Sequence, residues 1–372
     1  MKSKWMVMMV AVLVASFALS GAGVAAAAGD GGAVYTLTNR TAGNGVAIFN
    51  RAADGTLTAA GIVATGGLGT GAGLGSQGAL TLSANHKWLF AVNAGSNEVS
   101  VLAVSPNGLT LVDKVASGGA QPISVTTAKN LVYVLNAGGS GNITGFTLNK
   151  QGQLTPIAHS TRTLSNNGSG AAPGPAQISF SPDGEVLVVT EKGTNLIDTF
   201  PVDEDGVAGS VTTHPSAGTT PFGFAFTKRG TLIVSEAAGG AANASSASSY
   251  DVSADNFESI SAAVPTQQTA ACWAVATKNG KVAYTANAGS GSISLYTVNR
   301  DGALTLRSSV AGFTGATSHP SDMALSHNSQ FLYVLANVTQ AIGAFAVQGD
   351  GSLVAVTGAS GLPATAVGLA AW

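Results

Sequence analysis

The sequence predicts an all-β protein, a seven-bladed β-propeller with four antiparallel strands in each blade. Three observations lead to this fold class: a strand–turn unit recurs seven times, the order of its turns recurs with it, and the two chain ends carry complementary parts of one unit. A lone four-stranded sheet cannot bury both faces, whereas a ring of such sheets packs each blade between two neighbours. A β-sandwich with fortuitous periodicity is the alternative, but it leaves the repeated turns unexplained.

The clearest copy of the unit covers residues 281–306, KVAYTANAGSGSISLYTVNRDGALTL. Residues 282–286 form its first predicted strand. Residues 293–298 form the second, because their side chains alternate between two faces. The turn 299–302 ends at Gly302, a residue that adopts positive φ without steric cost, and a third strand begins at Ala303. The unit therefore reads as a meander of short antiparallel strands.

The first strand of every copy ends at an Asn or a Glu, at a mean spacing of about fifty residues. These residues are Asn39, Asn93, Asn136, Glu191, Glu236, Asn287 and Asn337. A third strand follows a glycine turn in six copies, for example residues 206–211 (GVAGSV) in the fourth.

A fourth strand precedes each first strand from the second copy onward. Residues 33–39 are a first strand with no fourth strand before it. Residues 366–372 match a fourth strand with no first strand after it. We therefore expect the N- and C-terminal strands to share one blade and close the ring.

The N-terminal segment predicts export. Lys2 and Lys4 precede an apolar run over residues 5–19, and small residues follow as far as Ala28. This arrangement is typical of a secretory signal peptide, and the run is short for a membrane span. We expect a signal peptide over residues 1–28, one propeller domain over 29–372, a secreted or periplasmic location, and no membrane insertion after cleavage.

Composition excludes several kinds of partner and cofactor. Charged residues make up 9% of the chain and the net charge is −2, so no basic stripe for nucleic acid is present. The five histidines lack metal-ligand spacing, and the single cysteine, Cys272, is expected to be a buried small hydrophobe rather than a reactive thiol. Gly73, Gly75 and Gly78 match GxGxxG, but they precede a strand and open no helix, which argues against a dinucleotide site. We expect neither a metal nor a cofactor.

The topology places a candidate site at one end of the channel. Each innermost strand joins the next by a tight turn, so the start of the innermost strand and the end of the following one share a face. The strand-end Asn and Glu residues should therefore meet Gln177, His319 and Asp322 in a polar funnel. A structural role is the alternative for the Asn residues, because Asn after a strand satisfies backbone groups and tolerates positive φ.

The repeat unit resembles that of the seven-bladed propeller lactonases. The shared residues are LYV-x-N-x-G, I-S-x-F/Y and DG-x-L, with SPDG between strands, and they cover nearly all of the chain after residue 28. That family includes the propeller type of 6-phosphogluconolactonase and the fungal 3-carboxymuconate cyclase. Surface-layer proteins with YVTN repeats share the unit, so the resemblance implies the fold more firmly than an activity.

The family's catalytic positions are half retained. A Pro-His-Pro-His-like run before the fourth blade is Pro-Gly-Pro-Ala here, at 173–176, and a Pro-Arg-His run before the fifth is Pro-Phe-Gly, at 221–223. The resemblance keeps Glu236 and Glu191 as candidate acid–base groups. The lost cationic groups would hold an anionic substrate and stabilise oxyanion charge. Two functions follow: a lactone hydrolase or cycloisomerase, or a catalytically degenerate propeller that acts as an extracellular binding or scaffold module.

The expected ligand is a small neutral lactone or carbohydrate. Glu236 is predicted next to the Phe222 ring and near Glu191, with no cation close by, so desolvation and like-charge repulsion should raise its pKa. A neutral carboxyl suits a hydroxyl-rich ligand better than a phosphorylated one, and Glu236→Gln should then change the affinity. The predicted ligand-binding residues are Gln177, Phe222, Asn287, His319, Asp322 and Asn337.

Overall fold

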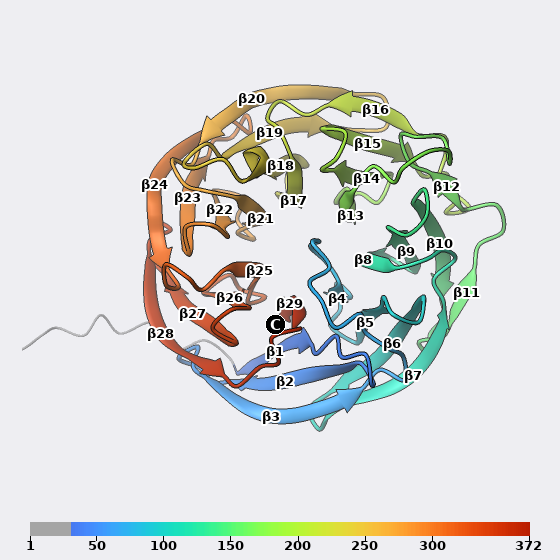
Figure 1. Cartoon of the computed structure of the whole chain (residues 1–372), viewed down its shortest axis with the longest axis horizontal. Coiled ribbons are helices and arrows are strands. Elements are labelled where there is room, and N and C mark those ends of the chain that lie inside the picture. The colour runs from blue at the N-terminus through green and yellow to red at the C-terminus, as the bar shows by residue number, and fades with distance from the viewer. Residues whose placement is uncertain (1–30) are drawn as a thin grey trace, which may run out of the picture.

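The computed structural model of the protein describes residues 31–372, and within them seven antiparallel sheets, six of four strands and one of five, form a ring (Figure 1). The predicted signal peptide, residues 1–28, lies outside the described residues. Within 31–372, no helix has the length and apolar character needed to cross a membrane. The seven-bladed propeller predicted from the repeats is confirmed.

Each blade is ordered from the channel outward. Blade 1 contains β29 (Val367–Ala371), β1 (Gly32–Leu37), β2 (Gly45–Arg51) and β3 (Leu57–Ala64). Blade 2 contains β4 (Leu80–Leu82), β5 (Trp88–Asn93), β6 (Glu98–Ser105) and β7 (Gly108–Ala116). Blade 3 contains β8 (Pro122–Ala128), β9 (Leu131–Asn136), β10 (Asn142–Leu148) and β11 (Leu154–Pro156), with β12 (Arg162–Thr163) also paired to β10.

The remaining blades follow the same order. Blade 4 contains β13 (Pro175–Phe180), β14 (Val186–Glu191), β15 (Leu196–Pro201) and β16 (Thr212–Pro215). Blade 5 contains β17 (Pro221–Phe226), β18 (Thr231–Glu236), β19 (Ser246–Val252) and β20 (Phe257–Pro265), with the 3₁₀ turn η1 (Ala238–Gly240) after β18. Blade 6 contains β21 (Ala271–Ala276), β22 (Val282–Asn287), β23 (Ser292–Val298) and β24 (Leu304–Phe313). Blade 7 contains β25 (Pro320–Leu325), β26 (Phe331–Ala336), β27 (Ala341–Val347) and β28 (Leu353–Ser360).

One outer strand differs from the sequence prediction. Residues 206–211 form no strand in blade 4, apart from a single bridge between Val202 and Ala208. The Gly209 N–H instead donates to the Pro201 carbonyl at 2.7 Å, so the segment makes a turn against the end of β15. The outer strand is β16, six residues later than predicted, because two glycines within six residues weaken the earlier segment as a strand.

The second strand of each blade lies deepest. Strands β14, β18, β22 and β26 are buried at every residue, since both faces of the strand pack against neighbouring blades. Continuous apolar sequence such as VLVV and FLYV suits this two-sided burial. The outer strands instead alternate partly buried and exposed residues, as β24 does.

Ring closure occurs where the sequence predicted it. Strand β29 pairs with β1 from Val34–Ala371 to Leu37–Val367. Arg51 Nε donates to the Trp372 carbonyl at 3.1 Å. Blade 7 adds a side-chain contact to blade 1, because the buried Tyr333 hydroxyl donates to the Gly55 carbonyl at 2.9 Å. The two ends of the chain are therefore held in one sheet and tied to the neighbouring blade.

Candidate functional site

A glycine-rich loop, residues 66–78, lies across the central channel between β3 and β4. In Figure 1 the segment before β4 runs inward to the middle of the ring. The Gln77 side chain pairs with the backbone of Ala274 on β21: Nε2 donates to its carbonyl at 2.8 Å and Oε1 accepts its N–H at 3.0 Å. The Trp273 indole N–H donates to the Ser76 carbonyl at 3.0 Å. The loop thus joins blade 2 to blade 6 across the channel.

Glycine permits the path of this loop. Gly71, Gly75 and Gly78 all have positive φ, which other residues adopt only with strain. A Cβ on Gly78 would lie 2.8 Å from the Ser124 hydroxyl. Of the GxGxxG glycines, Gly75 and Gly78 therefore serve the backbone conformation of the loop, and Gly78 also permits its close approach to blade 3.

The loop separates two cavities. One, here called the mouth pocket, has a volume of about 280 Å³ and is lined by Gly73, Leu74, Gly75, Ser76, Trp273, His319, Ser321, Asn337 and Val367. The other, here called the lower channel, has a volume of about 260 Å³ and is lined by Gln77, Gly78, residues 80–82, Val125, Thr126, residues 177–179, residues 322–325 and residues 369–371.

Two of the predicted ligand-binding residues meet in the mouth pocket. His319 precedes β25 and is exposed, and Asn337 follows β26. The Asn337 Nδ2 donates to the Ala366 carbonyl at 2.9 Å, while its buried Oδ1 has no partner among the described residues. His319 and Asn337 therefore offer polar atoms to this pocket, as the shared face of their strands predicted.

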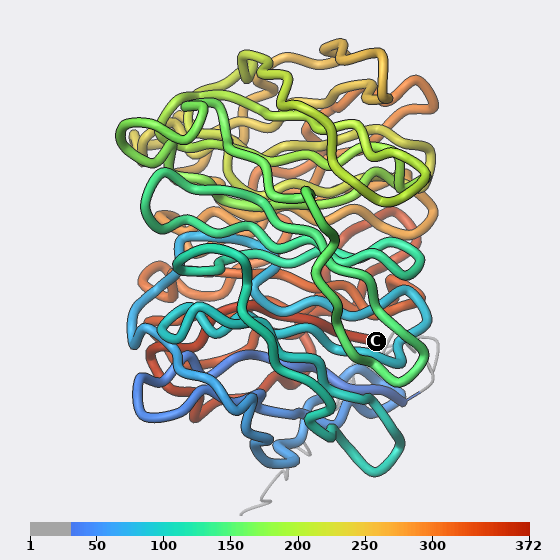
Figure 2. The backbone as a smooth tube through the Cα atoms, turned by 90° about the vertical axis from the view of Figure 1, so that its right-hand side faces the viewer, coloured from blue at the N-terminus to red at the C-terminus, as the bar shows by residue number. Residues whose placement is uncertain are grey.

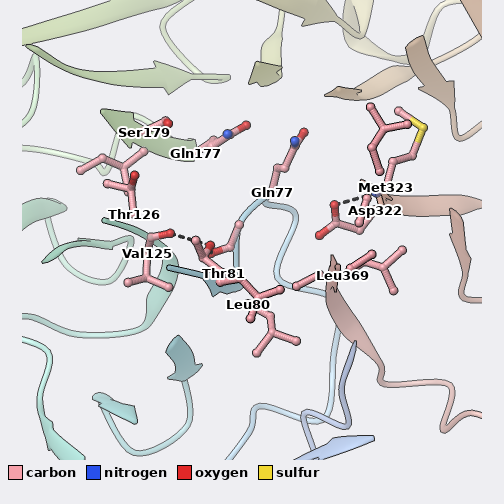
Figure 3. Close-up of a pocket in the computed structure, with 17 residues that line it drawn as sticks. Gln77, Leu80, Thr81, Val125, Thr126, Gln177, Ser179, Asp322, Met323 and Leu369 are labelled. Carbon is pink, nitrogen blue, oxygen red and sulfur yellow. Dashed lines mark hydrogen bonds between the residues drawn. The ribbon is translucent and has the colours of Figure 1, made fainter. Parts of the chain in front are cut away.

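Two others, Gln177 and Asp322, line the lower channel (Figure 3). The Gln177 Nε2 donates to the Phe224 carbonyl at 3.0 Å, and its Oε1 accepts the Phe224 N–H at 2.7 Å. The Gln177 side chain thus joins blade 4 to blade 5. Asp322 is 1% exposed. Its Oδ1 accepts the Met323 N–H at 2.7 Å, whereas Oδ2 has no partner among the described residues. Burial raises the pKa of Asp322 well above its ordinary value.

Glu191, predicted as an acid–base group, is fully buried at the end of β14. Its carboxylate accepts the Ser165 N–H at 3.1 Å, the Ser165 hydroxyl at 2.6 Å and the Thr194 hydroxyl at 2.5 Å. These bonds fix the loop that leads into blade 4. Glu191 does not line either cavity, so its catalytic role stays a prediction without geometric support.

Glu236, the second predicted acid–base group, is also fully buried. It accepts the Gly218 N–H at 2.9 Å and the Ser246 and Ser248 hydroxyls at 2.5 Å each. Burial raises the pKa of Glu236 and these bonds lower it, so the predicted direction is confirmed. The predicted repulsion from Glu191 is not among the causes, because each glutamate is enclosed within its own blade. Glu236 lines neither cavity.

Asp198 is a buried acid that the sequence analysis missed. It lies on β15, two residues beyond the cross-strand partner of Glu191, and is fully buried. The pKa of Asp198 is raised to about 9. Burial is the largest cause, and a hydrogen bond to Glu191 and repulsion from its charge add to it. A hydrogen bond from the Ser165 backbone opposes this rise. The raised pKa favours a protonated Asp198 beside the Glu191 carboxylate.

A cation that the sequence analysis did not place approaches Phe222, whereas no cation is among the causes that shift the pKa of Glu236. The Lys192 ammonium lies 4.7 Å from the Phe222 ring centroid. It donates to the Pro175 carbonyl at 3.0 Å and to the Gly75 carbonyl. Burial lowers the pKa of Lys192 to about 8. The sequence signal was a lysine directly after the strand-end Glu191.

Phe222 itself packs in the apolar lining of the ring. Its centroid lies 5.2 Å from that of Trp273, and it lines neither cavity. Cys272 beside them is 8% exposed, as predicted, and burial raises the pKa of its thiol to about 12.

Asn287 has the structural role that the sequence left open. It is fully buried, and its Nδ2 donates to the Ser292 and Ser294 hydroxyls at 3.1 and 2.9 Å. Asn93 makes the equivalent bond to Ser100 at 2.7 Å. These amides hold their own hairpins and do not line either cavity. Among residues 31–372, no group of three or more His, Cys, Asp or Glu side chains could hold a metal ion.

The comparisons with known proteins agree with this architecture. The model of the family described as "Lactonase, 7-bladed beta-propeller" matches residues 140–237 and 235–327. The chain belongs to this family. A 6-phosphogluconolactonase from Yersinia enterocolitica is 26% identical to this lactonase propeller over 164 residues, a match that spans 44% of this chain and 45% of the relative.

Solved structures share the fold at low sequence identity. A protein from Lactobacillus plantarum is 20% identical with a TM-score of 0.72, and the match covers 91% of this chain and 99% of that one. A periplasmic gluconolactonase from Pseudomonas aeruginosa is 15% identical with a TM-score of 0.68, over 91% and 98% of the two chains.

Proposed function

We propose that this lactonase propeller binds a small neutral lactone or sugar in the mouth pocket, and that Glu191 and Glu236 take no part in chemistry. The observation that carries the proposal is the burial of both carboxylates, each of which accepts hydrogen bonds from its own blade. A general acid or base must lie within about 2.6–3.2 Å of the proton that it transfers, or one water away. Neither glutamate can reach a ligand in either cavity without unfolding the loop that it holds.

The mouth pocket suits a neutral ring. Its lining combines the Trp273 side chain and the backbone of the glycine-rich loop with three polar side chains, Ser321, His319 and Asn337. The unpartnered Asn337 Oδ1 can accept a hydroxyl proton. A mostly apolar cavity with a few convergent polar groups is the usual form of a small-molecule site.

The charge distribution supports a neutral ligand over a phosphorylated one. No Lys or Arg lines the mouth pocket in the described residues. The Lys192 ammonium group donates its hydrogen bonds to the backbone carbonyls of Gly75 and Pro175. A phosphate in the pocket would therefore lose its hydration without gaining a counter-ion.

A second candidate function, lactone hydrolysis, is favoured by the position of His319. This residue is exposed and is the titratable side chain on the wall of the mouth pocket. As a general base it would take a proton from water while the water oxygen attacks the lactone carbonyl. The ring C–O bond then breaks, and the proton passes to the departing ring oxygen, which gives a hydroxy acid.

Calorimetric titration with D-glucono-1,5-lactone and its 6-phosphate tests ligand binding. A hydrolysis assay with the same two compounds tests lactone hydrolysis. We expect the neutral lactone to bind at least tenfold more tightly than the phosphate, and ring opening to stay at the spontaneous rate. His319→Asn should weaken binding. The matched control is His159→Asn, an exposed histidine that also has positive φ. Glu236→Gln should leave the affinity within twofold, in contrast to the effect expected from sequence alone.

Two results would change the assignment. Tighter binding of the phosphorylated lactone would show that a cation reaches the pocket, and the neutral-ligand proposal would fail. Ring opening above the spontaneous rate that disappears in His319→Asn but persists in His159→Asn would establish the hydrolase instead.

We also propose that the protein is exported, to the periplasm or outside the cell. Support comes from Lys2, Lys4 and the apolar run that follows them, which is typical of a signal peptide. Mass spectrometry of the exported protein should find a mature N-terminus between Ala27 and Asp30. A mature form that retains Trp5 would contradict the proposal.

A further inference from the structure

The lower channel lies on the opposite side of the glycine-rich loop from the mouth pocket. Its walls are the innermost strands β4, β8, β13, β25 and β29, and Gln77 forms its roof (Figure 3). It extends to Leu82 and Leu325, which precede turns, and to Ala371 at the end of β29. Figure 2 shows the ring from the side, with the blue strands of blade 1 at the bottom and the yellow-green strands of blades 4 and 5 at the top.

The lower channel offers hydrogen-bonding groups that the fold does not use. Asp322 points from β25 toward the middle of the cavity in Figure 3, and its Oδ2 has no partner among the described residues although the residue is 1% exposed. The Nε2 atoms of Gln77 and Gln177 each make one bond, to Ala274 and Phe224, and an amide nitrogen carries two protons. A buried polar atom without a partner destabilises the fold, so a ligand that satisfies it gains affinity.

Charge decides the kind of ligand. Asp322 is the titratable residue on the walls, and burial raises its pKa well above its ordinary value, which favours the neutral form. No Lys or Arg lines the cavity in the described residues, so an anion would have no counter-ion there.

The turns at the open end of the lower channel disfavour a cation. The His86 and His327 rings, from blades 2 and 7, lie with centroids 4.6 Å apart. Lys278 Nζ lies 2.9 Å from His327 Nε2. Lys278 adds positive charge beside these turns, whereas burial and repulsion from His327 and Lys278 lower the pKa of His86. An uncharged molecule avoids both the repulsion at the entrance and the missing counter-ion within.

We propose that the lower channel is a second ligand site, which binds a small uncharged polyhydroxylated molecule through Asp322 and the free amide protons of Gln77 and Gln177. The hydroxyl groups of such a ligand both donate and accept, so they match an acid proton, two amide protons and the oxygens of Thr81, Thr126 and Ser179. The site does not depend on the function proposed for the mouth pocket.

Three six-carbon probes of equal length test the charge preference by calorimetry: D-glucitol is neutral, D-gluconate is an anion and D-glucamine is a cation. We expect glucitol to bind at least tenfold more tightly than either charged probe. Asp322→Asn, which keeps an uncharged hydrogen-bonding group, should retain glucitol binding within about threefold. Asp322→Leu should abolish it.

Control variants separate this site from the mouth pocket and from general effects on the fold. Asp198→Asn replaces another buried acid that lies outside both cavities, so it should not change glucitol affinity. Loss of glucitol binding in His319→Asn would instead assign glucitol to the mouth pocket. If Asp322→Leu does not fold, Leu325→Phe narrows the lower end of the channel at a partly exposed position and should weaken glucitol at least tenfold. Undiminished glucitol binding in Leu325→Phe, loss of binding in His319→Asn, a preference for gluconate, or no measurable glucitol binding would each overturn the proposal.

Discussion

Blades 4 and 5 place a buried glutamate at the same position and satisfy it in different ways. Glu236 in blade 5 accepts hydrogen bonds from the Ser246 and Ser248 hydroxyls, which are uncharged donors. In blade 4 the position equivalent to Ser248 holds Asp198, an acid beside the acid Glu191. A buried glutamate at this position is therefore satisfied by a serine hydroxyl in blade 5. In blade 4 its neighbour is an acid, and the raised pKa of Asp198 favours the protonated form of that neighbour.

The difference makes blade 4 sensitive to pH. The pKa of Asp198 is about 9 in the folded state and 3.8 in a model peptide, so between these values the folded state binds more protons than the unfolded state. The contribution of Asp198 to the free energy of unfolding is full below the unfolded pKa and falls as the pH rises through 4 to 9. The raised pKa of Glu236 acts in the same direction, but the serine donors oppose it.

The largest loss of stability should come from opening the ring, and the effects of changes in blades 4 and 5 can be compared with it. Deletion of residues 366–372 removes β29 and leaves the channel-facing edge of β1 without a partner strand. We expect the protein to unfold or aggregate, as judged by circular dichroism and size-exclusion chromatography. A truncated protein that stays monomeric with an unchanged Tm would contradict closure by β29.

Removing each glutamate should then distinguish the blades. Glu236→Leu leaves the Gly218 N–H and two serine hydroxyls without an acceptor, and should lower the free energy of unfolding by roughly 3–5 kcal/mol. Glu191→Leu should cost roughly 1–3 kcal/mol, because Asp198 remains nearby as a second acceptor. Urea denaturation at pH 6 measures both. Equal losses would show that Asp198 does not compensate.

Exchanging the neighbours should transfer the pH dependence. Asp198→Ser should raise the free energy of unfolding at pH 8 by about 1–3 kcal/mol and flatten its decline between pH 5 and 8. Ser248→Asp should introduce a decline of the same sign into blade 5. Urea denaturation across this pH range is the measurement. If Asp198→Ser keeps the pH profile of the wild type, the acid pair is not its source.

The smallest effect should come from converting blade 5 to the amide form found in blade 6. Glu236→Gln keeps a carbonyl for the Gly218 N–H, and its amide protons can donate to serine hydroxyls as those of Asn287 do. We expect a change in the free energy of unfolding of about 1 kcal/mol, the usual net value of one hydrogen bond. A loss as large as that of Glu236→Leu would show that the charge, rather than the hydrogen-bond geometry, holds the loop.

The sequence by itself determined the ring and the face on which a ligand site could lie. Strand pairing within a blade depends on alternating side chains and glycine turns a few residues apart, so residues 281–306 already specified β22, β23 and the start of β24. Closure followed from the incomplete units at the two ends. The shared face of His319 and Asn337 followed from strand direction alone.

Only the tertiary structure decided which polar residues face a cavity. The path of the glycine-rich loop depends on Gln77 and Ala274, which are 197 positions apart, and no local pattern encodes that contact. The burial of Glu191 and Glu236 depends on the loops that carry Ser165 and Gly218, which have no repeat signature. Repeated local pairing is visible in a sequence because its period is short, whereas the environment of a buried acid is set by packing between distant segments.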